Sequence, residues 1–364
     1  MNKIKAFLAR KGVVCSFRQY GVDALGAMAQ GLFCTLLVGT ILNTLGQQLH
    51  IGFLTAPVVS VGTVSYTVGG LASAMVGPGI AVAIGTALHC PPLVLFSLIP
   101  VGFAANAMGG AGGPLAVYAV TILAAELGKL VSKETRIDIL VTPCVTVIAG
   151  IAVAQLIAAP IGTAARAVGL AIMWATELQP FFMGVLVSAL IGIALTLPIS
   201  SAAICAAFGL TGLAGGAAVA GCCAQMVGFA VMSFKENRWG GLVAQGVGTS
   251  MLQMPNILKN PRIWIPPTLA SMITGPLATC VFKLQMNGSP VSSGMGTCGF
   301  VGQIGVYTGW VSDIAAGTKA AITPMDWIGL VLICFILPAV LSTLFCRVLE
   351  KRGWIREGDM KLDL

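Results

Sequence analysis

The stretch that decides the fold is Thr176–Ala203, which reads TELQPFFMGVLVSALIGIALTLPISSAA. After Glu177 it carries no charged residue, and it is longer than the roughly 20 mainly apolar residues that a transmembrane helix needs. The charge-poor region also extends well beyond it, because Arg166 and Glu177 are the only charged residues between Ile139 and Phe234. This stretch predicts a membrane-spanning helix with a single carboxylate at its start.

The whole chain has the same character. Only 9% of its 364 residues are charged and 57% are hydrophobic, with a mean hydropathy of +0.95. Soluble domains carry about 25% charged residues, so a chain this poor in charge cannot cover its surface against water. Further uncharged runs lie between Asp23 and Glu126, between Arg262 and Lys283, and between Asp326 and Arg347. We therefore predict an all-α polytopic integral membrane protein in contact with the lipid bilayer.

The formal net charge of +8 does not indicate nucleic acid as a partner. The basic residues sit in short clusters between apolar runs, a pattern typical of cytoplasmic loops in membrane proteins. The basic segment 1–23 predicts a cytoplasmic amphipathic lead-in rather than a cleaved signal peptide. We expect both termini to face the cytoplasm, with residues 24–347 embedded in the membrane and residues 348–364 forming a cytoplasmic tail.

The side chains that usually hold metals or cofactors are sparse. There are 11 cysteines without CxxC spacing and only two histidines, which argues against a zinc site. The chain has no GxxxxGK[ST] phosphate-binding loop. We predict no metal, no cofactor and no catalytic residue.

Apolar helix candidates and their interruptions predict about 8–10 transmembrane or re-entrant helices, some of them broken by Gly and Pro. The candidates are 24–46, 51–75, 79–104, 114–131, 139–160, 180–198, 203–232, 264–283 and 326–347. The positive-inside rule requires one of the middle candidates to break, and 203–232 is favoured because of its glycine cluster at 210–221. Segments 239–256 and 288–318 are too glycine-rich for plain spans, so a re-entrant path is expected at least for 239–256. Broken helices of this kind mark solute sites in transporters.

Polar residues in or beside these segments are the candidate solute-binding residues. Uncharged donors and acceptors suit a neutral polyhydroxylated solute, although they would also suit hydrogen bonds between helices. Glu177 could accept hydrogen bonds from solute hydroxyls, or it could simply end a helix and pair with Arg166. Asp313, Lys319 and Trp310 favour an interfacial loop. The predicted binding residues are Glu177, Ser200, Ser201, Gln225, Gln253, Asn256 and Gln303.

Four runs carry a resemblance to a known family. They are LQPFFMGVLVSALIGIALTLPISSAAI (178–204), GCCAQMVGFAVMSFKEN (221–237), GGLVAQGVGTSMLQMPNILKNPRIWIPPTLAS (240–271) and GMGTCGFVGQIG (294–305). The chain resembles the membrane enzyme-IIC-like family of the phosphoenolpyruvate sugar phosphotransferase system, and most of all the branch that includes the perfringolysin O regulator.

The resemblance implies a homodimeric sugar permease of the bacterial inner membrane. In that family a separate IIB protein, which receives its phosphoryl group from IIA, phosphorylates the bound sugar. This chain would then be at most the membrane component of the phosphotransferase. Glucose-type members carry a Gly-Ile-Thr-Glu motif whose Glu contacts the sugar. Thr176 and Glu177, followed by Phe181 and Phe182, are similar to its second half, whereas the Gly-Ile half is missing.

Three functions remain open from the sequence. The first is an enzyme-IIC-type permease for a sugar-like small molecule. The second is a membrane-bound regulator or sensor that has the permease fold and does not transport. The third is an ion-coupled secondary transporter.

Overall fold

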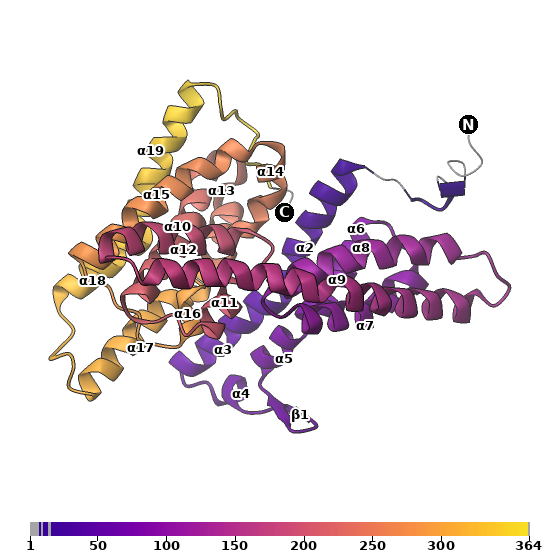
Figure 1. The fold of residues 1–364 in the computed structure, drawn as a ribbon, viewed down its shortest axis with the longest axis horizontal. Coiled ribbons are helices and arrows are strands. Elements are labelled where there is room, and N and C mark those ends of the chain that lie inside the picture. Colours follow the sequence, from indigo (N-terminus) through magenta and orange to yellow (C-terminus); the bar gives the residue numbers. More distant parts are fainter. Residues whose placement is uncertain (1–6, 9, 14–15, 363–364) are drawn as a thin grey trace. The chain divides into compact units, whose positions relative to one another are not determined.

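The computed structural model describes residues 7–8, 10–13 and 16–362. In these residues the only strands are β1 (Val59–Val61) and β2 (Val64–Tyr66), which form one small antiparallel hairpin. The chain divides into two compact units, Met1–Ala165 and Arg166–Leu364, here called unit 1 and unit 2 (Figure 1).

The first long element of unit 1 is a single helix. It is continuous through η1 (Arg18–Asp23), α2 (Ala24–Leu32), η2 (Phe33–Leu37) and α3 (Val38–Gln48), and it contains 31 residues. The predicted span 24–46 is therefore confirmed and is longer than expected.

The span predicted over 51–75 is wrong. This region holds the short helix α4 (Gly52–Thr55), the β1–β2 hairpin and α5 (Val68–Ala74). Pro57 cannot donate a helical hydrogen bond, and Gly62 turns the hairpin at φ +61°. Apolar composition alone did not reveal these interruptions. The next helix, α6 (Val76–Ala87), is bent by 54° from α5.

The rest of unit 1 is a helical hairpin and a long helix. Helix α7 (Pro92–Gly109), the turn η3 (Gly110–Gly112) and α8 (Gly113–Val131) fold back at Gly110, which has φ +52° and ψ −123°. As a result Gly128 lies against Val94. Helix α9 (Asp138–Thr176) follows and continues into unit 2.

Small residues allow the helices of unit 1 to pack closely. A Cβ atom on Gly77 would lie 2.2 Å from the carbonyl oxygen of Gly102, so α6 and α7 are in backbone contact there. This is the usual packing of helices in lipid, where close approach replaces the hydrophobic effect as the driving force.

Unit 2 is built around α12 (Gly212–Met232), which is buried along almost its whole length. It is packed by α10 (Pro180–Thr196), α15 (Ile265–Pro276) and α19 (Leu337–Lys351) (Figure 1). The remaining elements are α11 (Ser201–Ala207), α13 (Phe234–Val243), η4 (Ala244–Gly248), η5 (Ser250–Gln253), α14 (Met254–Lys259), η6 (Pro261–Trp264), η7 (Leu277–Val281), α16 (Pro290–Ser293), η8 (Cys298–Phe300), α17 (Val301–Ala315), α18 (Pro324–Val331) and η9 (Leu332–Ile336).

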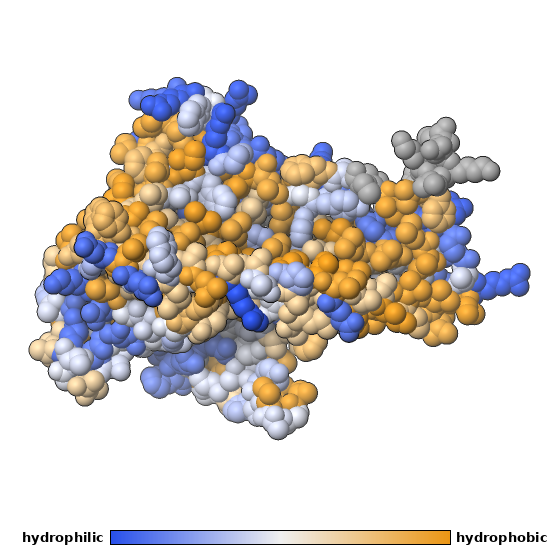
Figure 2. Space-filling model, viewed as in Figure 1, coloured by the Kyte–Doolittle hydropathy of each residue, from blue (hydrophilic) through white to orange (hydrophobic). Residues whose placement is uncertain are grey.

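The helices have the length and surface of membrane spans. Among the described residues five are long and apolar enough to cross a bilayer, and the bent pair α5–α6 adds a sixth if it crosses as one broken span. One of the five, Pro92–Val131, turns back at Gly110 and so offers two passes. Large apolar side chains are exposed on them, such as Ile139 (78%) and Leu156 (74%), and Figure 2 shows apolar residues over much of the visible face. The all-α polytopic membrane fold is confirmed.

Candidate functional site

The first broken segment of unit 2 follows α10. The chain leaves the helix at Leu197, and the Ser200 hydroxyl caps α11 by accepting a hydrogen bond from the Ala203 N–H at 3.1 Å. Gly209 and Gly212, both with positive φ, then turn the chain into α12. The predicted break within 203–232 is confirmed, and it lies at the start of the glycine cluster because only glycine adopts this backbone without strain.

A second broken segment lies between α16 and α17. Gly296 has φ +54°, and a Cβ atom there would lie 2.9 Å from the backbone carbon of Cys222. The loop is therefore pressed against the middle of α12. Ser201 ties the two broken segments together, since its hydroxyl donates to the Gly294 carbonyl at 2.7 Å.

The third broken segment is 239–256, where α13, η4 and η5 replace the plain span that the glycines made doubtful. Element η4 packs against η8 of the second segment. The Ser250 hydroxyl lies 2.8 Å from the Thr196 hydroxyl at the end of α10. Three broken segments thus surround α12, and irregular backbone is tolerated at membrane depth where protein or a water-filled cavity surrounds it.

Gln303 lies in the first turn of α17, beside the tip of the second broken segment. Its Nε2 donates to the Cys223 Sγ at 3.2 Å. Its Oε1 is buried and has no hydrogen-bond partner among the described residues. An unpaired buried acceptor costs about 1–3 kcal/mol, so this oxygen would gain from a ligand that donates a hydroxyl.

Gln225 has a different environment. It is fully buried, and its Oε1 accepts hydrogen bonds from the Trp264 indole at 3.0 Å and from Thr196 at 3.3 Å. Its Nε2 donates to Thr268 at 3.2 Å. Gln225 and Cys223 are two residues apart on α12 and point about 200° away from each other. The structure therefore separates Gln225 from Gln303.

Gln253 and Asn256 are brought together by a chain of amides. Asn256 Nδ2 donates to Gln253 Oε1, Gln253 Nε2 donates to Gln245 Oε1, and Gln245 Nε2 donates to the Ser233 hydroxyl, each at 2.8–2.9 Å. All four side chains are buried, so this amide chain closes the end of α12.

The amide chain holds the end of the protein itself. Residues 354–362, here called the C-terminal strap, run across it. Gln253 donates to the Met360 carbonyl at 2.9 Å, and Asn256 donates to the Lys361 carbonyl at 2.8 Å. Gln253 and Asn256, which we predicted from the sequence to bind the solute, therefore form hydrogen bonds with the strap.

Glu236 and Asn237 were not predicted, and they hold the strap from the other side. The Glu236 carboxylate accepts hydrogen bonds from the N–H groups of Gly358 (2.9 Å) and Met360 (3.0 Å). Asn237 accepts from the Leu362 N–H at 2.8 Å and donates to the Met360 carbonyl at 2.8 Å. The only sequence feature that marked them was the charged cluster Lys235–Arg238.

The strap gathers basic residues at one end of unit 2. Because it contacts Asn237, Asn256 and Asn260, the clusters 235–238 and 259–262 lie at the same end, together with the end of α19. This is the arrangement expected if that end faces the cytoplasm. We call it the basic end.

Glu177 lies apart from the other predicted residues. It is exposed in the turn after α9, and its carboxylate has no hydrogen bond or ion pair among the described residues. Thr279 donates to the Pro180 carbonyl at 2.8 Å, which places the start of α10 next to η7. The 17 residues of α10 separate Glu177 from Thr196 by about 25 Å.

No cluster of metal-ligating side chains occurs in the part of the chain that the structure describes. The chemistry available around α12 is therefore hydrogen bonding by hydroxyls and amides, which can recognise a polar solute and orient it.

One family model matches the chain, that of the phosphotransferase system EIIC proteins, and it covers residues 22–362. No curated protein and no solved structure gives a significant match. The narrower resemblance to the branch of the perfringolysin O regulator thus stays a resemblance. The match spans nearly the entire sequence and both structural units, and the chain belongs to the EIIC family, the membrane sugar-permease components of the phosphotransferase system.

Proposed function

We propose that this protein binds a neutral, polyhydroxylated sugar beside the middle of α12 and presents it for phosphorylation at the basic end. Helix α12 has 21 residues and a length of about 31 Å, close to the thickness of the hydrocarbon core. Residues near Cys223 would then lie at mid-depth, where transporters with broken helices bind their solutes.

The observation that carries the proposal is the unpaired, buried carbonyl oxygen of Gln303. A sugar hydroxyl can donate to it, and a buried charge is not required on either partner. Ser200 and Ser201 lie on the adjoining broken segment, and their hydroxyls are the next contacts that we assign to the solute. Gln225 would act by positioning, because its amide holds α10, α12 and α15 together rather than facing a free volume.

The family relation implies IIA and IIB proteins as partners. We place the IIB docking surface at the basic end, which we orient to the cytoplasm of a bacterial cell together with both termini. Gln253 and Asn256 would then belong to the phosphorylation side, beneath the strap. The proposed protein is a homodimer in which residues 24–347 are embedded in the membrane and residues 348–364 form a cytoplasmic tail.

Sugar uptake by proteoliposomes tests the function. The full chain is reconstituted with its cognate IIB protein in phosphorylated form on the basic side, and labelled sugars are offered on the other side. We expect one sugar to accumulate as its phosphate, and only when phosphorylated IIB is present. Accumulation of the free sugar driven by an ion gradient alone would contradict the proposal, and so would sugar binding without any transport.

A further inference from the structure

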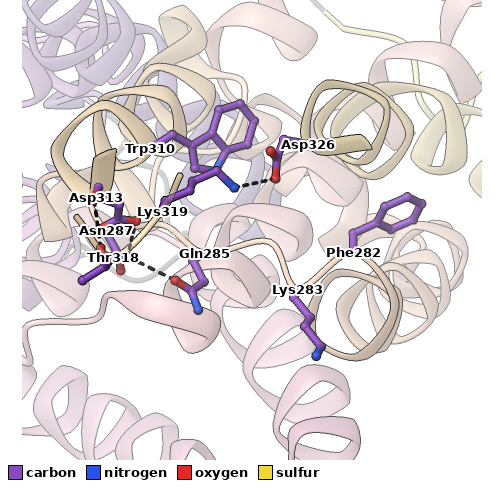
Figure 3. Close-up of a pocket in the computed structure, with 9 residues that line it drawn as sticks. All are labelled: Phe282, Lys283, Gln285, Asn287, Trp310, Asp313, Thr318, Lys319 and Asp326. Atoms are coloured by element: carbon purple, nitrogen blue, oxygen red, sulfur yellow. Dashed lines mark hydrogen bonds and ion pairs between the residues drawn. The ribbon is translucent and has the colours of Figure 1, made fainter. Parts of the chain in front are cut away.

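A polar pocket of about 470 Å³ lies at the end of unit 2 opposite the basic end (Figure 3). The backbone of Met286 pairs with that of Gly212, in two hydrogen bonds of 3.0 Å, where α12 begins. The C-terminal strap lies beyond the other end of α12. The volume is within the range of small-molecule sites, about 300–1,000 Å³.

One wall of the pocket is the segment 283–287, which begins at Lys283 and pairs with Gly212 at Met286. Its side chains alternate, as in a strand: Lys283, Gln285 and Asn287 line the pocket, whereas Leu284 and Met286 are buried in the core. A single short segment therefore offers three polar side chains to one cavity.

The charges that line the pocket sum to zero. Lys319 forms an ion pair with Asp326 at 2.9 Å, and Figure 3 shows Lys319 beside Trp310 and directed at Asp326. Lys283 and Asp313 supply the other two charges, and neither has an ion pair among the described residues. A pocket whose lining charges sum to zero favours a ligand without net charge over a phosphate or an amine.

The groups that remain free suit hydroxyls. Asn287 Nδ2 donates to Asp313 Oδ2 at 2.8 Å, which fixes that carboxylate and leaves its other oxygen as an acceptor (Figure 3). The Lys283 ammonium supplies donors, and so does the exposed Gln285 amide, whose Oε1 already accepts a hydrogen bond from Asn287 Nδ2 at 3.3 Å. A ligand that donates and accepts at neighbouring positions, as a polyol does, can use all three residues at once.

The backbone at Lys283 is unusual. It has φ +47°, a left-handed conformation that helix ends usually assign to glycine, and it follows the end of η7. A lysine there is strained, and residues held in such conformations cluster at functional sites. Glycine would have satisfied the turn, so the choice of lysine needs a reason beyond the fold.

Helix α17 connects this pocket to the Gln303 site. Asp313 lies near its end and Gln303 in its first turn, so the two residues are ten positions apart, or about 15 Å along the helix. A sugar held by Asp313 would therefore be about 15 Å, measured along α17, from the unpaired oxygen of Gln303.

We propose that this pocket is an outer capture site that binds a sugar-sized polyol before it reaches the middle of α12. The identification of the ligand as a sugar rests on the proposed function. The preference of the pocket for a neutral ligand with hydroxyl groups is argued from its lining residues alone. Trp310, which is almost fully buried, is a wall of the site and not a stacking surface.

The test is ligand protection of Lys283. The purified full chain in nanodiscs is acetylated with sulfo-N-hydroxysuccinimidyl acetate, alone or with glucose, N-acetylglucosamine, mannitol, galactitol, lactose or cellobiose. Mass spectrometry gives the rate at Lys283 relative to the rate at Lys351, which lies at the basic end. We expect at least one sugar to slow the reaction at Lys283 only.

Variants show whether the pocket is responsible. Asp313→Asn keeps an acceptor for Asn287 and removes the charge, and we expect about tenfold weaker protection, the effect of one hydrogen bond to a charged group. Glu357→Gln is the matched control, because it replaces an exposed carboxylate near the basic end. In this variant the sugar should protect Lys283 as well as in the native chain. Tryptophan fluorescence and the thermal midpoint verify that each variant is folded.

The outcomes separate the two proposals. If no sugar slows acetylation of Lys283, or if Asp313→Asn is protected as well as the native chain, the capture site is refuted, even when phosphorylation-dependent uptake is intact. If a sugar protects Lys283 through Asp313 but is never transported, the capture site stands and the permease function fails.

Discussion

Replacing Gln303 by leucine should cost solute binding without costing stability. In the free protein the Gln303 Oε1 is buried without a hydrogen-bond partner among the described residues, where the amide makes one hydrogen bond, of 3.2 Å, to the Cys223 sulfur. Removing an unpaired acceptor relieves about 1–3 kcal/mol, which offsets the lost contact to sulfur. We therefore expect the free energy of unfolding to stay within about 1 kcal/mol of the native value, or to rise.

Gln225→Leu is the matched comparison, because Gln225 is also a buried glutamine of unit 2. Its amide makes three hydrogen bonds, to Trp264, Thr196 and Thr268. Hydrogen bonds between membrane helices average about 0.6 kcal/mol, and the Trp264 indole would be left unpaired, so a loss of about 2 kcal/mol is expected.

The assay measures both properties of both variants. Unfolding by denaturant in lipid bicelles gives the stability, and equilibrium dialysis with the transported sugar gives the affinity. Loss of one neutral hydrogen bond, about 1 kcal/mol, should weaken binding about fivefold in Gln303→Leu. If Gln303→Leu binds normally and is destabilised as much as Gln225→Leu, then Gln303 is a packing residue and the assignment of the site is refuted.

Three further predictions concern charged residues. Glu236→Gln weakens the two charge-assisted hydrogen bonds to the C-terminal strap, so hydrogen exchange of the strap amides should accelerate about tenfold, whereas Glu357→Gln should leave it unchanged. The hydrogen bond from Lys11 lowers the pKa of Glu134. The ion pair is therefore fully formed above the ordinary carboxyl pKa and should be lost as the pH falls through the lowered pKa of Glu134. Hydrogen exchange of the amides of residues 10–13 would report this loss. The sequence predicts that Glu177→Gln abolishes solute binding, whereas the exposed position of Glu177, a helix length away from Thr196, predicts unchanged affinity in dialysis; loss of binding by the folded variant would return Glu177 to the solute site.

Much of the fold could be predicted from the sequence because lipid imposes a strong rule on it. The uncharged run at 180–198 predicted the apolar helix α10, which at 17 residues is shorter than the five candidate spans, and glycines marked the breaks that produce α11 and the loop before α17. The span over 51–75 failed since apolar composition does not distinguish a helix from a short hairpin when Pro57 and Gly62 lie within it.

The site was predictable only in part, because residue type does not determine which side chains meet. Gln225, Gln253 and Gln303 look alike in the sequence, yet one joins three helices, one holds the strap and one has a free oxygen. The strap could not be foreseen, since it depends on backbone groups of residues 358–362 that any sequence would offer. The pocket around Asp313 was interpreted as an interfacial loop, because the alternation at 283–287 becomes visible only once the structure of the segment is known.

The most direct test of the central claim is the chemical form of the sugar after transport. Proteoliposomes that contain the full chain and phosphorylated IIB protein are given a labelled sugar, and the internal product is identified by mass spectrometry. If the protein is a permease of the EIIC type, the sugar should be recovered as its phosphate. Gln303→Leu should lower the transport rate at limiting sugar concentration about fivefold, because it binds the sugar more weakly. Recovery of unmodified sugar, or equal rates for Gln303→Leu and the native chain, would contradict the account.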